Sequence, residues 1–266
     1  MTHPQSMPLP ADLRLMNMAA AALLLVFVLL GLVGLAWWLL RHPAFSLQAI
    51  TVQGEVARNN AFVFRTQVVP KLEGNFFTLD LTQTRQAFEA VPWVRAAVVH
   101  REFPNRLRTV LSEHHPLAVW GEAGANTMVN LQGQVFEANL EDADAERLPR
   151  LMGPEGESLT VANMYATLLP RFQALEMDIE LLEWTPRGSW RLETKQAAVI
   201  ELGRGSKEQL QQRVDVFIAT LAQVTASYGR SPVSLISADL RHKDGYALRL
   251  QGVTTLETDP LKKTLD

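Results

Sequence analysis

The longest apolar run in the sequence lies near the N-terminus. From Met18 to Leu40 it holds 23 residues without a charge, most of them Ala, Leu and Val. As a helix this run spans about 35 Å, which is enough to cross a hydrocarbon core about 30 Å thick. Trp37 and Trp38 stand at its end, where indole rings favour the membrane–water interface. A cleaved signal peptide has a shorter apolar core, of about 7–15 residues, and a small-x-small cleavage site that this run lacks. We therefore predict an uncleaved transmembrane helix over 18–40, after a short tail over 1–17 that is too short to fold.

The pattern after this helix predicts a first small domain. Alternating polarity and cap residues indicate five elements: a strand over 45–52, a short helix capped by Asn59 and Asn60 that ends near Val69, a helix from Asp80 to about Ala90, and strands over 94–102 and 107–112. The resulting β-α-α-β-β order is satisfied in two layers by a sheet with both helices on one face. We expect this α+β domain to cover 45–116.

The remaining residues predict a second, β-rich domain with a long helix and a C-terminal β-hairpin. The expected elements are a hairpin over 127–130 and 135–137, a helix from Ser158, strands over 179–184, 190–193 and 199–202, a helix over about 207–228 capped by Ser206, and a hairpin over 235–240 and 246–250. Pro170 should kink or interrupt the first helix. The apolar stripe of the second consists of Leu210, Val214, Phe217, Leu221 and Val224. We expect this β domain to cover 117–252, with a weakly structured acidic stretch over 137–146, and a polar tail to follow over 253–266.

Charge and composition exclude several classes of function. The 25 basic and 28 acidic residues nearly cancel, so the chain as a whole does not attract nucleic acid. There is no cysteine, which excludes disulfides, thiolate zinc sites and thiol nucleophiles.

The motifs that could carry chemistry do not have the required spacing. Residues 203–207, Gly-Arg-Gly-Ser-Lys, lack the four residues that a Walker loop places between its glycines, and a strand-to-helix turn explains them better. His114 and His115 would point to opposite faces of a strand and could not easily share a metal ion. No Gly-x-Ser-x-Gly elbow is present. We therefore predict no enzyme, and no catalytic, cofactor, metal or small-molecule site.

Two surfaces could bind a partner. A basic tract in the first domain comprises Arg85, Arg95, Arg101, Arg106 and Arg108. It is either a solvated strand face or a docking surface for an acidic partner or for anionic lipid headgroups, given its nearness to the membrane helix. The last predicted strand leaves an edge that is either structural or able to accept a strand from another chain.

Five motifs in order resemble one family. Residues 91–107, which include Pro92-Trp93-Val94 and Phe103-Pro104, resemble the "PW(V/I)…(F/W)P..L" signature of the FtsQ family. The others are 113–120 (Glu-His-His-Pro-Leu-Ala-Val-Trp), 148–156 (Leu-Pro-Arg-Leu-Met-Gly-Pro-Glu-Gly), 202–205 (Leu-Gly-Arg-Gly) and 238–241 (Ala-Asp-Leu-Arg). The resemblance covers nearly the whole chain. It departs at His242, where the family often has an aromatic residue.

The resemblance implies a fold, a place and a role. It implies that the first domain is a POTRA domain, and that the chain sits in the inner membrane of a Gram-negative bacterium with its N-terminus cytoplasmic and its domains periplasmic. The role would be to link early and late division proteins at the septum. The family's C-terminal strand binds FtsB of the FtsB–FtsL complex by strand addition, and the POTRA domain is thought to contact other divisome proteins. Carried over by motif, the partner-binding residues are Arg204, Arg241, His242, Asp244, Gly245 and Tyr246.

An alternative function belongs to another class. A POTRA domain also fits a secretion or outer-membrane biogenesis component that binds unfolded polypeptide. A C-terminal β-barrel would favour that role, but about 130 residues that include a long helix cannot form one.

Overall fold

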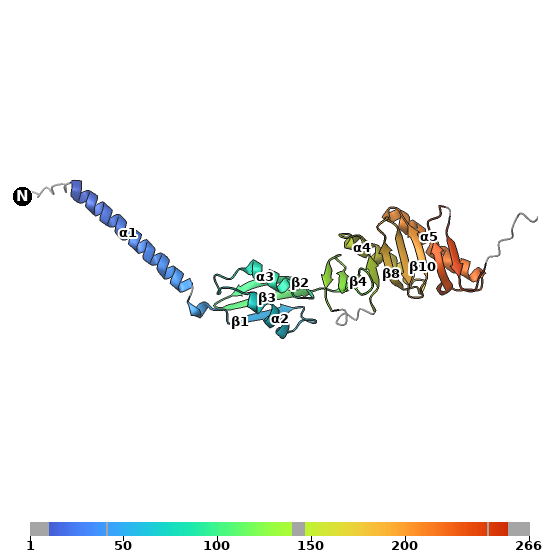
Figure 1. The fold of residues 1–266 in the computed structure, drawn as a ribbon, viewed down its shortest axis with the longest axis horizontal. Coiled ribbons are helices and arrows are strands. Elements are labelled where there is room, and N and C mark those ends of the chain that lie inside the picture. Colours follow the sequence, from blue (N-terminus) through green and yellow to red (C-terminus); the bar gives the residue numbers. More distant parts are fainter. Residues whose placement is uncertain (1–10, 41, 140–146, 244, 255–266) are drawn as a thin grey trace, which may run out of the picture. The chain divides into compact units, whose positions relative to one another are not determined.

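The fold is described from a computed structural model, in which residues 11–40, 42–139, 147–243 and 245–254 are placed. The chain divides into two compact units, Met1–Glu113 and His114–Asp266, and Figure 1 shows the elements of each.

The N-terminal helix α1 (Ala11–Leu40) contains the predicted apolar span. Within the described part of the chain, its segment Leu15–Trp38 is the one helix long and apolar enough to cross a membrane. Its large apolar side chains are exposed all round, which suits lipid and would not suit water. The expectation of an unfolded tail up to residue 17 was wrong, because the helix begins at Ala11. The residues from Ala11 onward include good helix formers.

The first unit after α1 has the predicted order of elements. They are β1 (Ala49–Gly54), α2 (Ala61–Gln67), α3 (Leu81–Glu89), β2 (Val94–Glu102) and β3 (Arg106–Glu113), with short 3₁₀ turns η1 (Pro43–Phe45) and η2 (Val69–Lys71). The sheet order is β1-β3-β2, with β1 parallel and β2 antiparallel to β3. Phe64 of α2 and Phe88 of α3 belong to the same buried cluster as Ala97 and Leu111 of the sheet. Both helices therefore cover one face, as predicted.

The predicted caps of both helices are confirmed. The Asn60 side chain accepts a hydrogen bond from the Val63 N–H at 3.0 Å. The Asp80 carboxylate accepts one from the Thr82 N–H at 2.7 Å. Each cap satisfies N–H groups that the first helical turn leaves without a partner, and this fixes where the helix begins.

The predicted strand over 45–52 was wrong at its start, since β1 begins only at Ala49. Phe45 lies in the turn η1, its carbonyl accepts the Phe76 N–H at 2.9 Å, and its ring packs edge-on against Phe77 at 4.9 Å. Phe45 therefore packs on another aromatic ring and does not lie on a strand face.

The second unit is built on a nine-stranded sheet. Its strands are β4 (Pro116–Trp120), β5 (Thr127–Asn130), β6 (Val135–Glu137), β7 (Arg150–Met152), β8 (Ile179–Trp184), β9 (Trp190–Thr194), β10 (Val199–Gly203), β11 (Leu235–Asp239) and β12 (Ala247–Leu250). Their order is β12-β11-β10-β9-β8-β7-β4-β5-β6. The helices are α4 (Ser158–Gln173) and α5 (Lys207–Ser227), with a 3₁₀ turn η5 (Pro232–Ser234) before β11. One buried cluster joins both helices to the sheet.

Two details of the helices differ from the prediction. The predicted alternatives at Pro170 were a kink or an interruption, and the interruption is wrong, because α4 continues to Gln173. In α5, Val224 is only half-buried and Thr225 takes the buried position in its place. The Thr225 hydroxyl satisfies itself by donating to the Leu221 carbonyl at 2.9 Å, so burying it leaves no polar group without a partner.

His114 and His115 are not on a strand, contrary to expectation. They lie between β3 and β4. The His114 ring is buried, stacks on Phe136 at 4.1 Å, and has its Nδ1 3.0 Å from the Asn130 amide nitrogen. Packing within the second unit therefore explains why the His114 ring is buried.

Candidate partner-binding site

The strand β12 forms one end of the nine-stranded sheet. It pairs antiparallel with β11 alone, so its other side is a free edge in the described part of the chain. An uncovered edge presents backbone N–H and C=O groups that another strand can pair with. The predicted final hairpin is thus confirmed, and its outer strand is the accessible one.

The pairing pattern shows which backbone groups face outward. The Leu240 N–H donates to the Glu201 carbonyl of β10. The backbone N–H and C=O groups of the even-numbered residues around β11 therefore point toward β10, and those of Ser237 and Asp239 point toward β12. Their register partners are Arg249 and Ala247, whose backbone N–H and C=O groups therefore hydrogen-bond to β11. Because backbone direction alternates along a strand, the N–H and C=O of Leu248 point to the free edge.

Tyr246 holds β12 against the helix α5. Its hydroxyl lies 2.7 Å from the Thr220 hydroxyl, and its ring meets Phe217 edge-on at 5.1 Å. The Thr220 hydroxyl already donates to the Val216 carbonyl at 2.7 Å, so Tyr246 is the donor in this pair. The side chain thus points into the domain, and Tyr246 positions the edge strand.

Arg241 is fixed beside the start of the hairpin loop by Asp239. Its Nε and Nη2 donate to the two carboxylate oxygens at 2.8 and 2.6 Å, a two-pronged pair. The hydrogen bond from Arg241 is the main reason that the pKa of Asp239 falls to about 2. The same carboxylate raises the pKa of Arg241. More than half of the guanidinium side chain remains exposed, so it can still reach a partner's anion.

The loop that carries Arg204 is built around a glycine. Gly203 has φ of +80°, and a Cβ there would lie 2.7 Å from the Arg241 Cγ. Only glycine combines that backbone conformation with that close approach. Nη1 of Arg213 then donates to the carbonyls of Leu202 and Arg204 at 3.1 and 2.7 Å, which fixes the loop to α5. As predicted, a strand-to-helix turn follows, closed by a capping box between Ser206 and Gln209.

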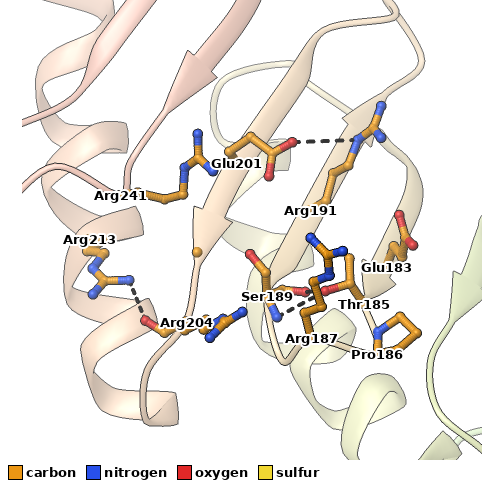
Figure 2. A pocket seen from close by; sticks show the side chains of 11 residues that line it. Glu183, Thr185, Pro186, Arg187, Ser189, Arg191, Glu201, Arg204, Arg213 and Arg241 are labelled. Atoms are coloured by element: carbon orange, nitrogen blue, oxygen red, sulfur yellow. Dashed lines mark hydrogen bonds and ion pairs between the residues drawn. The ribbon is translucent and has the colours of Figure 1, made fainter.

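These arginines surround an open pocket of about 750 Å³. Figure 2 shows its side chains, which come from the ends of β8 to β11 and from α5. Its charged residues are Arg187, Arg191, Arg204, Arg213 and Arg241 against Glu183 and Glu201. Nε of Arg191 lies 3.9 Å from the Glu201 carboxylate, which neutralises part of the charge. The excess of guanidinium groups makes the pocket suited to carboxylates.

Three of the carried-over residues lie in or beside the hairpin loop. His242 is exposed and lines a smaller hollow of about 300 Å³ together with Gly245 and Tyr246. Gly245 has φ of +156°, a positive value as the turn chemistry predicted. Asp244 lies outside the described residues. The structure therefore brings Arg204 and Arg241 to one pocket and places His242 and Tyr246 at another.

Sequence reasoning missed part of this site. Arg187, Arg191 and Arg213 come from a turn, a strand and a helix, and only the sheet register and the packing of α5 bring them together. The exposed Arg249 on β12 was also missed. Arg249 lies between the half-buried Leu248 and the buried Leu250. This alternation in the sequence could have indicated that the Arg249 side chain points outward from the edge strand.

Comparison with known proteins matches both units to described families. The model for the POTRA domain of FtsQ type matches residues 45–114. The model for the C-terminal part of cell division protein FtsQ/DivIB matches residues 118–241. The second match ends at Arg241 and so does not include β12.

Whole-chain relatives agree with these matches. Cell division protein FtsQ of Thiomonas arsenitoxydans is 36% identical over 92% of this chain and 90% of its own length. The protein of that name from Burkholderia pseudomallei is 36% identical over 95% of this chain and 99% of its own. That of Bordetella pertussis is 34% identical over 90% of this chain and 92% of its own.

Proposed function

The chain belongs to the FtsQ/DivIB family of cell division proteins, and we propose that it is a divisome scaffold that binds an FtsB–FtsL-type complex along the free edge of β12. The scaffold is anchored by α1 in the cell inner membrane, with its N-terminus cytoplasmic and both folded units periplasmic. It contacts other divisome membrane proteins and links early to late division proteins at the septum. The family is non-enzymatic, and the scaffold works by binding other chains.

The free edge of β12 is the observation that carries this proposal. A short terminal strand with an outward N–H and C=O at Leu248 offers main-chain hydrogen bonds to an incoming strand. One side of the strand is used by β11, and the other side pairs with no strand in the described part of the chain. Strand addition is the binding mode that fits an edge of this kind.

Charged side chains at this end of the sheet supply selectivity, and the arginine pocket lies at the ends of β8 to β11. Arg241 and Arg204 line it, and Arg249 projects from β12 on the same face of the sheet as Asp239. A partner strand laid along β12 would place its flanking side chains near Arg249, and Arg241 follows the neighbouring strand β11. We expect acidic side chains on that strand, because a carboxylate there gains charge-assisted hydrogen bonds.

A matched pair of variants tests the strand addition. Leu248→Pro removes the outward N–H without touching the bonds to β11, and proline is tolerated on edge strands. Leu248→Ala shortens the side chain but keeps the N–H. In a pull-down with the FtsB–FtsL complex, we expect the proline variant to lose binding and the alanine variant to retain most of it. Equal binding by Leu248→Pro and the unchanged protein would disprove strand addition at this edge.

The same pull-down separates the scaffold from a chaperone-like role. A scaffold retains the FtsB–FtsL complex and ignores unfolded polypeptide, whereas a POTRA-bearing secretion component retains unfolded clients broadly. Reduced carboxymethylated lactalbumin serves as the unfolded client. Its retention in competition with FtsB–FtsL would count against the proposed function.

A further inference from the structure

Four phenylalanines form an aromatic cluster at one end of the first unit. Phe45 of η1 packs on Phe77 at 4.9 Å, Phe77 on Phe76 at 5.2 Å, and Phe76 on Phe103 at 6.1 Å, each close to edge-on. Phe76 is buried, yet Phe77 is 43% exposed and Phe103, in the turn between β2 and β3, is 74% exposed. Adjacent large apolar side chains left in water on a folded domain mark a contact surface.

The exposed rings are held in place by the surrounding backbone. The Asn75 side chain accepts hydrogen bonds from the N–H groups of Phe77 and Thr78, both at 3.0 Å, which fixes the turn that presents Phe77. Arg101 donates from Nε to the Phe76 carbonyl at 2.7 Å and from Nη2 to the Leu79 carbonyl at 2.6 Å, so it fastens this turn to β2. The surface is therefore preorganised.

The cluster is covalently close to the membrane helix. Four residues separate Phe45 from Leu40, the last residue of α1, so even a fully extended chain places the two at most about 18 Å apart. The reach is shorter in fact, because Pro43–Phe45 is a 3₁₀ turn and the Trp38 ring meets His42 at 5.1 Å. The Gln48 N–H also donates to the Asn105 carbonyl at 3.0 Å, which ties the linker to the β2–β3 turn. Since the headgroup layer extends about 6–7 Å beyond the hydrocarbon core, these rings are within reach of it.

The charges at this end suit a phosphate surface. Arg106 and Arg108 are exposed at the start of β3. Neither guanidinium group has a hydrogen-bonding or ion-pair partner among the described residues. Glu102, in register with Arg106, and Glu73 are the nearby carboxylates in the sequence. Arg106, three residues after the exposed Phe103, is thus available to an outside anion, whereas Arg101 is already bonded to the Phe76 and Leu79 carbonyls.

We propose that the β2–β3 turn docks on the bilayer that α1 spans, with Phe103 and Phe77 in the headgroup region and Arg106 against lipid phosphates. Aromatic rings beside a cation match the amphipathic interface. This contact holds the first unit against the membrane surface. The inference rests on α1 as a membrane anchor and does not depend on the binding mode of β12.

Site-directed spin labelling of the full chain tests this directly, because the protein has no native cysteine. A nitroxide is placed at Phe103→Cys or, as control, at Arg95→Cys at the other end of β2, about 26 Å away along the strand. The protein is reconstituted in vesicles of phosphatidylethanolamine and phosphatidylglycerol, and collisions with oxygen and with a water-soluble nickel chelate are compared. We expect the oxygen-to-nickel ratio to be at least about twofold higher at 103 than at 95. Equal ratios would overturn the proposal.

A charge reversal tests the arginine. With the label at 103, Arg106→Glu should lower the oxygen-to-nickel ratio, whereas Arg95→Glu, an identical charge change far from the cluster, should leave it unchanged. Both residues are exposed on strands, so neither change disturbs the core. Equal effects of the two substitutions would show that Arg106 has no local contact with phosphate. Because the vesicles contain no other protein, a docking site for a protein partner would give an aqueous label at 103.

Discussion

Tyr246 is the residue for which resemblance and structure suggest different roles. The resemblance implies contact with the partner, whereas the side chain is turned toward α5. We predict that it acts by holding β12 in place. Tyr246→Phe keeps the ring on Phe217 and removes only the hydrogen bond to Thr220, which should cost about 1 kcal/mol. Tyr246→Ala also loses the edge-to-face contact, worth about 0.5–1.5 kcal/mol, and the apolar area that the ring buries.

Hydrogen exchange of the β12 amides measures this effect. A loss of about 1 kcal/mol in the local opening free energy corresponds to about fivefold faster exchange in Tyr246→Phe. Thr220→Val removes the same hydrogen bond from the α5 side and keeps the β-branched shape, so it should accelerate the same amides to a similar extent. The double variant should be no less stable than either single variant, which corresponds to a coupling energy of about 1 kcal/mol between Tyr246 and Thr220.

Partner binding then separates the two roles. If Tyr246 only positions the strand, Tyr246→Phe and Thr220→Val weaken binding of the FtsB–FtsL complex equally. Thr220 is on α5 and only reaches β12 through this bond. Weaker binding by Tyr246→Phe alone, with unchanged exchange, would refute the positioning role and show direct contact.

Two further predictions concern the arginine pocket. Gly203→Ala should lower the free energy of unfolding by about 1–2 kcal/mol and displace Arg241, since φ is +80° and the new Cβ would meet the Arg241 Cγ. Urea unfolding measures this loss. Gly188→Ala is the control for backbone strain alone, because Gly188 has φ of +79° and open space around it. Asp239 has a folded-state pKa lowered to about 2, so its ion pair stabilises the fold above the unfolded pKa of about 4 and is lost as pH falls through about 2. Asp239→Asn should therefore show a smaller loss of stability between about pH 4 and pH 2, by at most about 1 kcal/mol because the pair is partly exposed, and an acid profile identical to that of the unchanged protein would contradict this reading.

Local chemistry predicted much of the fold. Asn60, Asp80 and Ser206 marked helix starts because a side-chain acceptor for orphan N–H groups is needed at that point in any tertiary context. The strand β2 was predicted with its observed bounds, and the final hairpin was predicted from its Asp-Gly turn pair.

Long-range packing decided the rest. The strands β4 and β7 were not predicted, because β7 has three residues and exists only by pairing in parallel with β4 and β8. Phe45 was placed on a strand because its polarity pattern cannot reveal the Phe77 ring that it packs on. For the same reason, the motif resemblance identified Arg204 and Arg241, whereas Arg213, which fixes the Arg204 loop, needed the structure.

The most direct test of strand addition is the exchange rate of the Leu248 amide with and without the FtsB–FtsL complex, measured on the full chain in lipid nanodiscs. In the free protein this N–H faces the open edge and should exchange fast, while those of Ala247 and Arg249 are already bonded to β11. Saturating complex should strongly slow exchange at Leu248 and change its two neighbours little. A Leu248 amide that exchanges equally fast in the saturated complex would contradict the account.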